Sequence, residues 1–72
     1  MKEKVLKIAQ EFFECDIAIE SNMKNIAQWD SLAHINLFMA IESELSISCN
    51  IEEIIENTSI EKIVELLVSK QQ

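Results

Sequence analysis

The sequence predicts an all-α protein: a small four-helix bundle of three main helices and one short helix, with a long first loop. Three stretches repeat apolar residues at the spacing of one helix face. No stretch alternates apolar and polar residues as a half-buried strand does. The 72 residues suit one domain spanning 1–72, and 49% of them are hydrophobic, which is enough for a compact core.

The first expected helix runs from Met1 to about Glu14. Its core stripe should combine Val5, Ile8, Ala9 and Phe12, widened by Leu6 and Phe13. Residues 15–29 then show no sustained period, although a short helical turn fits near 21–25. A connection this long in a small domain is usually functional or well packed, so we expect it to lie across the bundle as a lid.

The second expected helix runs from Ser31 to about Ser46, and Asp30 is placed to cap it. At 100° per residue its core face comprises His34, Leu37, Phe38, Ile41 and Leu45. A neighbouring face carries Leu32, Ile35 and Met39. We expect these three to form a half-exposed apolar rim beside Ser31, bordered by Glu42, which would suit a docking surface. The alternative is that the long loop covers them.

A short third helix is expected over 51–56. Asn50 can cap it, with Glu53 as the capping-box partner. Its isoleucines, which are Ile51, Ile54 and Ile55, should face inward. Its glutamates, which are Glu52, Glu53 and Glu56, should face outward.

The last helix is expected to run to about Ser69. Thr58 with Glu61 forms a second capping box at its start. Lys70 suits the negative end of its dipole. Its core face should comprise Ile60, Ile63, Val64 and Leu67.

The composition restricts the partners and the compartment. Thirteen acidic against six basic residues give a net charge of −7, so nucleic acid and membrane insertion are not expected, and a basic protein surface is. Cys15 and Cys49 make neither a disulfide framework nor a zinc site, and no carboxylate spacing predicts a metal. We expect two reduced, partly buried thiols in a cytoplasmic monomer.

Ser31 has a specific chemical setting. It would occupy the first helical position, exposed, beside the positive end of the helix dipole. A phosphate ester on its hydroxyl would lie near unpaired backbone N–H donors.

With these elements placed, the chain resembles an acyl carrier protein over essentially its whole length. The central match is Asp30-Ser31-Leu32 at a helix start after a long loop. The rest of the match comprises Leu37, Met39-Ala40-Ile41-Glu42, Glu44-Leu45, Asn50-Ile51-Glu52-Glu53 and Thr58-Ser59-Ile60.

The resemblance implies that Ser31 receives 4′-phosphopantetheine from coenzyme A, attached by a separate phosphopantetheinyl transferase that uses Mg²⁺. The arm's thiol would then hold acyl or aminoacyl groups as thioesters, and the protein itself would catalyse nothing. Asp30 and Leu32 would flank the attachment site, with Asp30 serving transferase recognition. Loading and processing enzymes with basic docking surfaces would contact Ile35, Met39, Glu42, Glu44, Glu52, Glu53 and Glu56.

Several positions depart from the family pattern. Ala33, Asn36 and Ser43 replace acidic residues that are common in the second helix, and Trp29 stands where a small residue is usual. These departures favour a specialised carrier, serving polyketide, surface-polysaccharide or aminoacyl pathways, over a housekeeping fatty-acid carrier.

Three other interpretations compete with an acyl carrier. The chain could be an aminoacyl or peptidyl carrier, or a non-carrier acidic helical interaction module in which Ser31 is only a helix-start residue. A Ser31–His34 hydrolase lacks a third group to orient the imidazole, and His34 falls on the core face, where a hydrogen-bonded structural role is expected.

Overall fold

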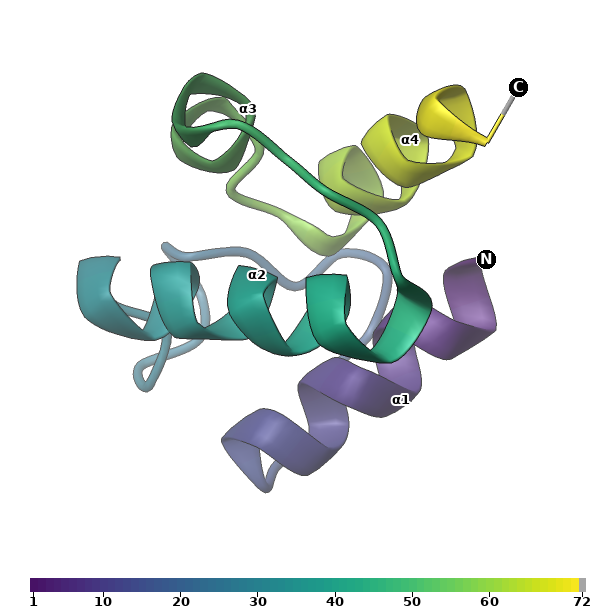
Figure 1. Cartoon of the computed structure of the whole chain (residues 1–72). Helices are drawn as coiled ribbons and strands as arrows, with labels where there is room; N and C mark the ends of the chain where they lie inside the picture. Colours follow the sequence, from purple (N-terminus) through teal and green to yellow (C-terminus); the bar gives the residue numbers. More distant parts are fainter. Residues whose placement is uncertain (72) are drawn as a thin grey trace.

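A computed structural model describes residues 1–71, which form four helices and no strand. They are α1 (Lys2–Phe13), α2 (Ser31–Leu45), α3 (Ile51–Glu56) and α4 (Ile60–Lys70). In Figure 1, α2 crosses the molecule with α1 on one side and α3 and α4 on the other. The all-α bundle with three main helices, one short helix and a long first loop is confirmed. The expected domain extends to residue 72, which lies outside the described residues.

The hydrophobic core lies where α1, α2 and α4 meet, and the first loop and α3 each add to it. Its buried hydrophobic residues are Val5, Ala9, Phe13, Ile17, Trp29, Leu37, Phe38, Ile41, Ile54, Ile60, Ile63 and Leu67. None of the helices within residues 1–71 has both the length and the apolar character of a membrane span.

The buried stripe of α1 is narrower than predicted. Val5, Ala9 and Phe13 recur every fourth residue and are buried, whereas Phe12 is 37% exposed and Ile8 only partly buried. The placement of Phe12 in the core was therefore wrong. Helix α1 packs against α2 and α4 through the narrow stripe that carries Val5, Ala9 and Phe13. Phe12 lies beside this stripe and therefore faces solvent.

The core face of α2 is confirmed. His34, Leu37, Phe38 and Ile41 are buried, and Leu45 is partly buried. The helix ends at Ser46, which adopts the left-handed conformation with φ 54°, as Glu14 does after α1.

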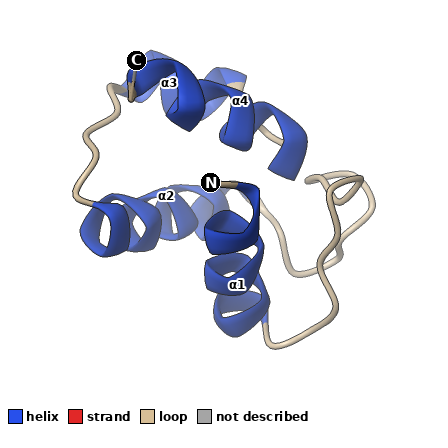
Figure 2. Cartoon of the chain, turned by 90° about the vertical axis from the view of Figure 1, so that its right-hand side faces the viewer, coloured by secondary structure: helices blue, strands red, loops and turns tan. Residues whose placement is uncertain are grey.

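The first loop, residues 14–30, is packed against the bundle as expected. Figure 2 shows it leaving α1, passing beside α4 and returning to α2. Two backbone hydrogen bonds tie it to the start of α4: Met23 N donates to Thr58 O at 3.1 Å, and Ile60 N donates to Ser21 O at 3.0 Å. The suggested helical turn is present as a single isolated turn over residues 23–25: Asn25 N and Ile26 N both donate to Asn22 O, at 3.2 and 3.1 Å, and the turn does not continue into a helix.

The orientation predicted for α3 was wrong for two of its three isoleucines. Ile54 is buried, but Ile51 and Ile55 are 57% and 62% exposed. A six-residue helix that packs on α2 through one face can bury only the side chain on that face. The capping box of Asn50 and Glu53 is confirmed, with both of its hydrogen bonds formed.

The start of α4 lies one residue later than predicted. Ser59, and not Thr58, caps the helix, because its hydroxyl accepts a hydrogen bond from Lys62 N at 3.2 Å. Thr58 lies before the helix, and its carbonyl accepts the hydrogen bond from Met23 N in the first loop. The predicted core face is confirmed at Ile60, Ile63 and Leu67, with Val64 partly buried.

Candidate functional site

Ser31 lies at the first position of α2, and the structure confirms its exposed placement there. Asp30 caps the helix: its carboxylate accepts a hydrogen bond from Ala33 N at 2.8 Å, and its carbonyl accepts one from His34 N at 2.8 Å. Among the described residues, the backbone N–H groups of Ser31 and Leu32 have no acceptor. A negatively charged ester on the Ser31 hydroxyl would find these two donors and the positive end of the helix dipole.

A cavity of about 210 Å³ opens beside Ser31, between α2, α3 and the first loop. Its lining residues are Met23, Ser31, His34, Ile35, Ile54 and Ile55. The sequence analysis did not foresee this cavity, because its walls come from three segments that are distant in the chain.

His34 forms the polar part of the cavity wall, yet both of its ring nitrogens already have partners. Trp29 Nε1 donates to His34 Nδ1 at 2.9 Å. An indole N–H can only donate, so Nδ1 is the acceptor and the proton resides on Nε2, which donates to Ile54 O. The imidazole is therefore neutral in this arrangement and unavailable as a base for Ser31. The predicted structural role of His34 is confirmed.

The apolar rim on α2 is exposed, so the alternative in which the loop covers it was wrong. Leu32, Ile35 and Met39 are 69%, 40% and 60% exposed. The two exposed isoleucines of α3, Ile51 and Ile55, add to the apolar surface of the molecule, and Ile55 joins Ile35 in lining the cavity. This exposure could have been predicted from the sequence, because a helix of six residues cannot bury three isoleucines.

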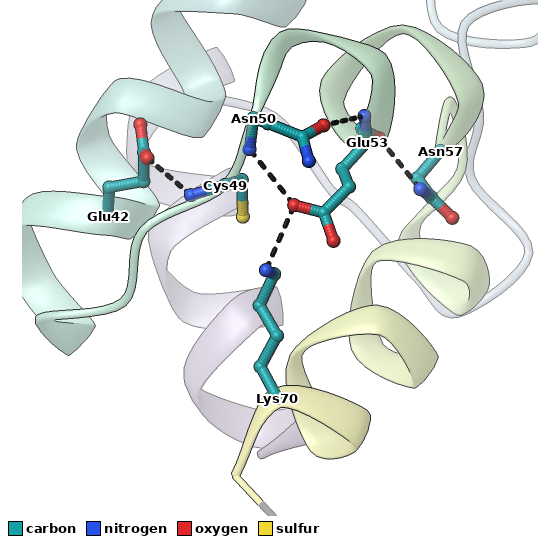
Figure 3. A network of polar contacts seen from close by, with 6 residues as sticks. All are labelled: Glu42, Cys49, Asn50, Glu53, Asn57 and Lys70. Atoms are coloured by element: carbon teal, nitrogen blue, oxygen red, sulfur yellow. Dashed lines mark hydrogen bonds and ion pairs between the residues drawn. The ribbon is translucent and has the colours of Figure 1, made fainter.

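The five glutamates proposed for partner contact have different surroundings. Glu44 faces α1, in a hollow that it shares with Lys4 and Lys7. Glu42 is partly buried, and its carboxylate accepts a hydrogen bond from Cys49 N at 2.8 Å (Figure 3). Glu52 and Glu56 on α3 are exposed.

Glu53 links two helices. Its carboxylate accepts the Asn50 N–H at 2.9 Å and pairs with Lys70 Nζ at 2.9 Å, so that α3 is linked to the last turn of α4 (Figure 3). Two hydrogen bonds hold the pKa of the Glu53 carboxyl below its usual range. The larger effect comes from the Asn50 N–H and the smaller one from the Lys70 ammonium. The same pair raises the pKa of Lys70. These are charge-assisted hydrogen bonds, and they serve the fold locally.

Both cysteines are free and partly buried, as predicted. Burial raises the pKa of the Cys49 thiol, and the nearby carboxylates of Glu42 and Glu53 add to the rise against the opposing effect of Lys70. A thiol with a raised pKa is a weak nucleophile at neutral pH. Within residues 1–71, no three His, Cys, Asp or Glu side chains gather as metal ligands would.

Comparison with known proteins adds one decisive observation. The model of the family described as "Phosphopantetheine attachment site" matches residues 3–67. The chain belongs to this family of carrier domains. No curated protein matches the carrier domain in a search of individual sequences.

The general function of this domain follows from its family. It is the site of covalent 4′-phosphopantetheine attachment, and domains of this kind are carriers and not catalysts. It therefore acts with a phosphopantetheinyl transferase and with biosynthetic enzymes. The residues around Ser31 fit such a group, because they combine an exposed hydroxyl, two unpaired N–H donors and an apolar cavity.

Proposed function

We propose that this chain is an acyl carrier protein of a specialised biosynthetic pathway and that Ser31 carries its 4′-phosphopantetheine arm. One observation supports this assignment most strongly: the exposed Ser31 hydroxyl stands at the first position of α2, next to N–H groups without acceptors. A phosphodiester formed there keeps a negative charge, which that end of the helix stabilises.

The attachment reaction follows from the chemistry of coenzyme A. The Ser31 Oγ attacks the phosphorus atom that bears the pantetheine. A new P–O bond forms to Ser31, and the bond to adenosine 3′,5′-bisphosphate breaks, so that this nucleotide leaves. The Ser31 proton passes to the transferase, which also supplies the site for Mg²⁺. His34 takes no part, because both of its nitrogens are engaged inside the protein.

Asp30 has two roles in this proposal. Its carboxylate accepts the hydrogen bond from Ala33 N and so holds the backbone of the first turn of α2, from which Ser31 projects. The same carboxylate is exposed, and it can present its second oxygen to the transferase and its metal ion. The transferase holds the metal ion in this scheme, and the Asp30 carboxylate either adds one oxygen ligand or accepts a hydrogen bond from a water bound to the metal.

The partner surface that we propose centres on the apolar rim. Leu32, Ile35 and Met39 extend along α2 from Ser31, and Glu52 and Glu56 supply exposed charge on α3. Glu42, Glu44 and Glu53 extend the acidic surface. Of these, Glu42 and Glu53 also hold internal hydrogen bonds, so their substitution would disturb the fold as well as a partner. Exposed apolar anchors with a charged border are typical of protein interfaces.

The arm's thiol would hold an acyl or aminoacyl group as a thioester. A flexible arm presents one cargo to several enzymes at high effective concentration without releasing it. Helix α2 carries Ala33, Asn36 and Ser43 in place of acidic side chains, which favours a polyketide, surface-polysaccharide or aminoacyl pathway over general fatty-acid synthesis. Since coenzyme A is the donor, we place the protein in the cytoplasm.

Intact-protein mass tests the attachment. The full chain is incubated with coenzyme A, Mg²⁺ and a broad-specificity transferase, with Ser31→Ala and Ser43→Ala alongside. We expect wild type and Ser43→Ala to gain one phosphopantetheine and Ser31→Ala to gain none while remaining folded. An unmodified, folded wild type would instead favour an acidic interaction module in which Ser31 only begins a helix.

A further inference from the structure

A groove lies between α1 and α2, and every residue that lines it belongs to one of these two helices. It consists of two adjoining hollows of about 450 Å³ and 290 Å³, which share Ile8, Glu11 and Glu44. In Figure 1, α1 lies on the side of α2 away from α3 and α4. The groove is therefore separate from the cavity beside Ser31, which α2, α3 and the first loop enclose.

Part of the groove is apolar and reached by water. Phe12, which lines one hollow, is 37% exposed, and Ile8 is only partly buried. From α2, the partly buried Ala40 and Leu45 complete this apolar lining. Covering an exposed phenyl ring and its aliphatic neighbours removes apolar area from water, which is favourable. The groove can therefore bind a second apolar surface.

Four charged side chains flank the apolar lining, and their order along α1 matters. Lys4 and Lys7 lie in the first half of α1, and Glu11 lies in its second half. The fourth, Glu44, comes from α2. Within residues 1–71, none of the four belongs to an ion pair. Lys4 and Glu11 are seven positions apart, about 10.5 Å along the helix axis, so a single copy does not bring them together.

The order of these charges indicates what kind of surface fits the groove. A uniformly acidic segment would match only the lysine end of α1, and a uniformly basic segment would match only the Glu11 end. A second copy of α1 that runs in the opposite direction matches both ends, because its acidic end meets the lysines and its lysines meet Glu11. A second copy that runs in the same direction would place like charges together.

We propose that the groove is the interface of a homodimer in which α1 packs antiparallel against α1 of a second copy. A twofold axis midway between Lys4 and Glu11 places Lys4 of each copy opposite Glu11 of the other, so the same contact is made twice. Phe12 then lies at the lysine end of the second copy's groove, where the larger hollow can receive its ring. Ser31 does not line the groove, so it stays accessible in the dimer.

The dimer should be weak. Exposed ion pairs contribute little, and two copies that each carry a net charge of −7 repel one another. An interface of this kind belongs to the small, transient class, so we expect a dissociation constant of about 0.5 mM. The expected monomer is then the main form at low concentration, and the dimer becomes prominent only near about 1 mM.

Sedimentation velocity of the full chain, from about 20 μM to about 1 mM, tests the interface through two charge reversals. Over this range the weight-average mass of wild type should rise by about half. Lys4→Glu and Glu11→Lys each place like charges together at both contacts, so each variant alone should remain monomeric. An equimolar mixture of the two restores opposite charges at both contacts, and its association should return to within about twofold of wild type.

Two controls separate this interface from general repulsion. Lys62→Glu makes the same change in net charge as Lys4→Glu, but on α4 and outside the groove, so it should dimerise nearly as wild type does. Glu11→Lys lowers the negative charge of the chain, so general repulsion alone predicts stronger association, whereas the antiparallel pairing predicts its loss. Circular dichroism checks that each variant is folded.

Three results would overturn the inference. They are a wild type that stays monomeric up to about 1 mM, a folded Glu11→Lys that associates more strongly than wild type, and a mixture of the two folded variants that stays monomeric. The experiment requires no arm on Ser31. Its failure would therefore leave the proposed function standing, and a failure of arm transfer would leave this inference standing.

Discussion

Trp29 Nε1 donates a hydrogen bond to His34 Nδ1 across 2.9 Å, and both side chains are buried. The other ring nitrogen, His34 Nε2, donates to Ile54 O. One imidazole therefore joins the first loop, α2 and α3. Burying polar groups is favourable only when each has a partner, and here each does.

Replacing His34 should therefore cost more stability than its size suggests. His34→Leu leaves the Trp29 N–H and the Ile54 carbonyl buried without partners, each at about 1–3 kcal/mol. We expect urea denaturation followed by circular dichroism to show a loss of roughly 2–5 kcal/mol. Trp29→Phe with His34→Leu removes both ends of the first hydrogen bond, and the double variant should lose less than the sum of the singles. Additive losses would contradict the described hydrogen bond.

The Glu53–Lys70 pair predicts a dependence of stability on pH. The pKa of Glu53 is lowered in the folded protein, so its contribution is complete above the pKa of the unfolded chain, and it is lost as the pH falls through the lower, folded value. The pKa of Lys70 is raised, so its contribution persists below the unfolded pKa and disappears as the pH rises through the folded one. The pair should then support the fold between about pH 4 and pH 10.

Melting temperatures from pH 2 to pH 7 test the acidic side of this window. Glu53→Gln keeps the shape and an acceptor oxygen but removes the charge, so it should flatten the decline of Tm below about pH 4. Glu52→Gln, on the same helix but in no recorded ion pair within residues 1–71, is the matched control and should leave the decline intact. Because the pair is near the surface, the difference between the variants should shrink in high salt. Indistinguishable pH profiles would rule out the assigned role of Glu53.

Asp30 allows its structural and chemical roles to be separated. Asp30→Ala removes the cap on Ala33 N and should cost about 1 kcal/mol of stability. Asp30→Asn keeps a capping oxygen, so its stability should stay near wild type, yet it lacks the charge proposed to face the transferase. Urea denaturation gives the first effect, and the rate of arm transfer at matched folded concentration gives the second. Equal transfer rates for wild type and Asp30→Asn would limit Asp30 to capping.

The rim should contribute to transfer without contributing to the fold. Leu32→Ala and Met39→Ala remove mostly exposed side chains, so their Tm should change by no more than a few degrees. Each should lower kcat/KM for arm transfer by about five- to thirty-fold, as truncated interface anchors do. Val68→Ala is the control. Val68 is partly exposed on the last turn of α4, which Figure 1 shows far from the start of α2, so its kcat/KM for arm transfer should match wild type. Full transfer activity in Leu32→Ala would place the docking surface elsewhere.

The sequence contains no glycine, and two helix ends show the result. Glu14 and Ser46 adopt positive φ angles of 54°, where a side chain is crowded by the backbone. Ser46→Gly should raise the stability by up to about 1 kcal/mol. Ser43→Gly, inside the same helix, should lower it by a similar amount. Calorimetric melting of the two variants checks the opposite signs, and a destabilised Ser46→Gly would contradict the left-handed geometry.

Local signals predicted those parts of the fold that depend on neighbours in the chain. Asp30 and Asn50 cap their helices as expected because a cap requires only residues two or three positions away. The core face of α2 followed from periodicity, since that helix is central and packs on several elements.

Tertiary contacts decided the rest. Thr58 and Ser59 are both able to cap α4, and the hydrogen bond from Met23 to the Thr58 carbonyl, contributed by a distant loop, selects Ser59. Ile55 looked like a core residue in the sequence, but α3 packs mainly against α2 through the face that carries Ile54, and so the side chain of Ile55 stays exposed. Neither outcome is encoded within a few residues of the position concerned.

The candidate site was predictable in its centre and not in its surroundings. The placement of Ser31 and the exposed rim followed from the helix start and the wheel of α2. The cavity and the Trp29–His34–Ile54 connection did not, because they bring together residues from the loop, α2 and α3. The role of Ser31 as the attachment residue remains a prediction for the mass measurement to decide.

The burial of Trp29 has a practical consequence. It is the sole tryptophan of the chain, it is 1% exposed, and it lies in a row of rings formed by Phe13, Trp29, His34 and Phe38. Its indole is held by hydrogen bonding to the side chain that also holds α3. The intrinsic fluorescence of this protein therefore reports on the site itself: any event that displaces α3 from α2 changes the surroundings of the only indole emitter, and no added dye is needed to observe it.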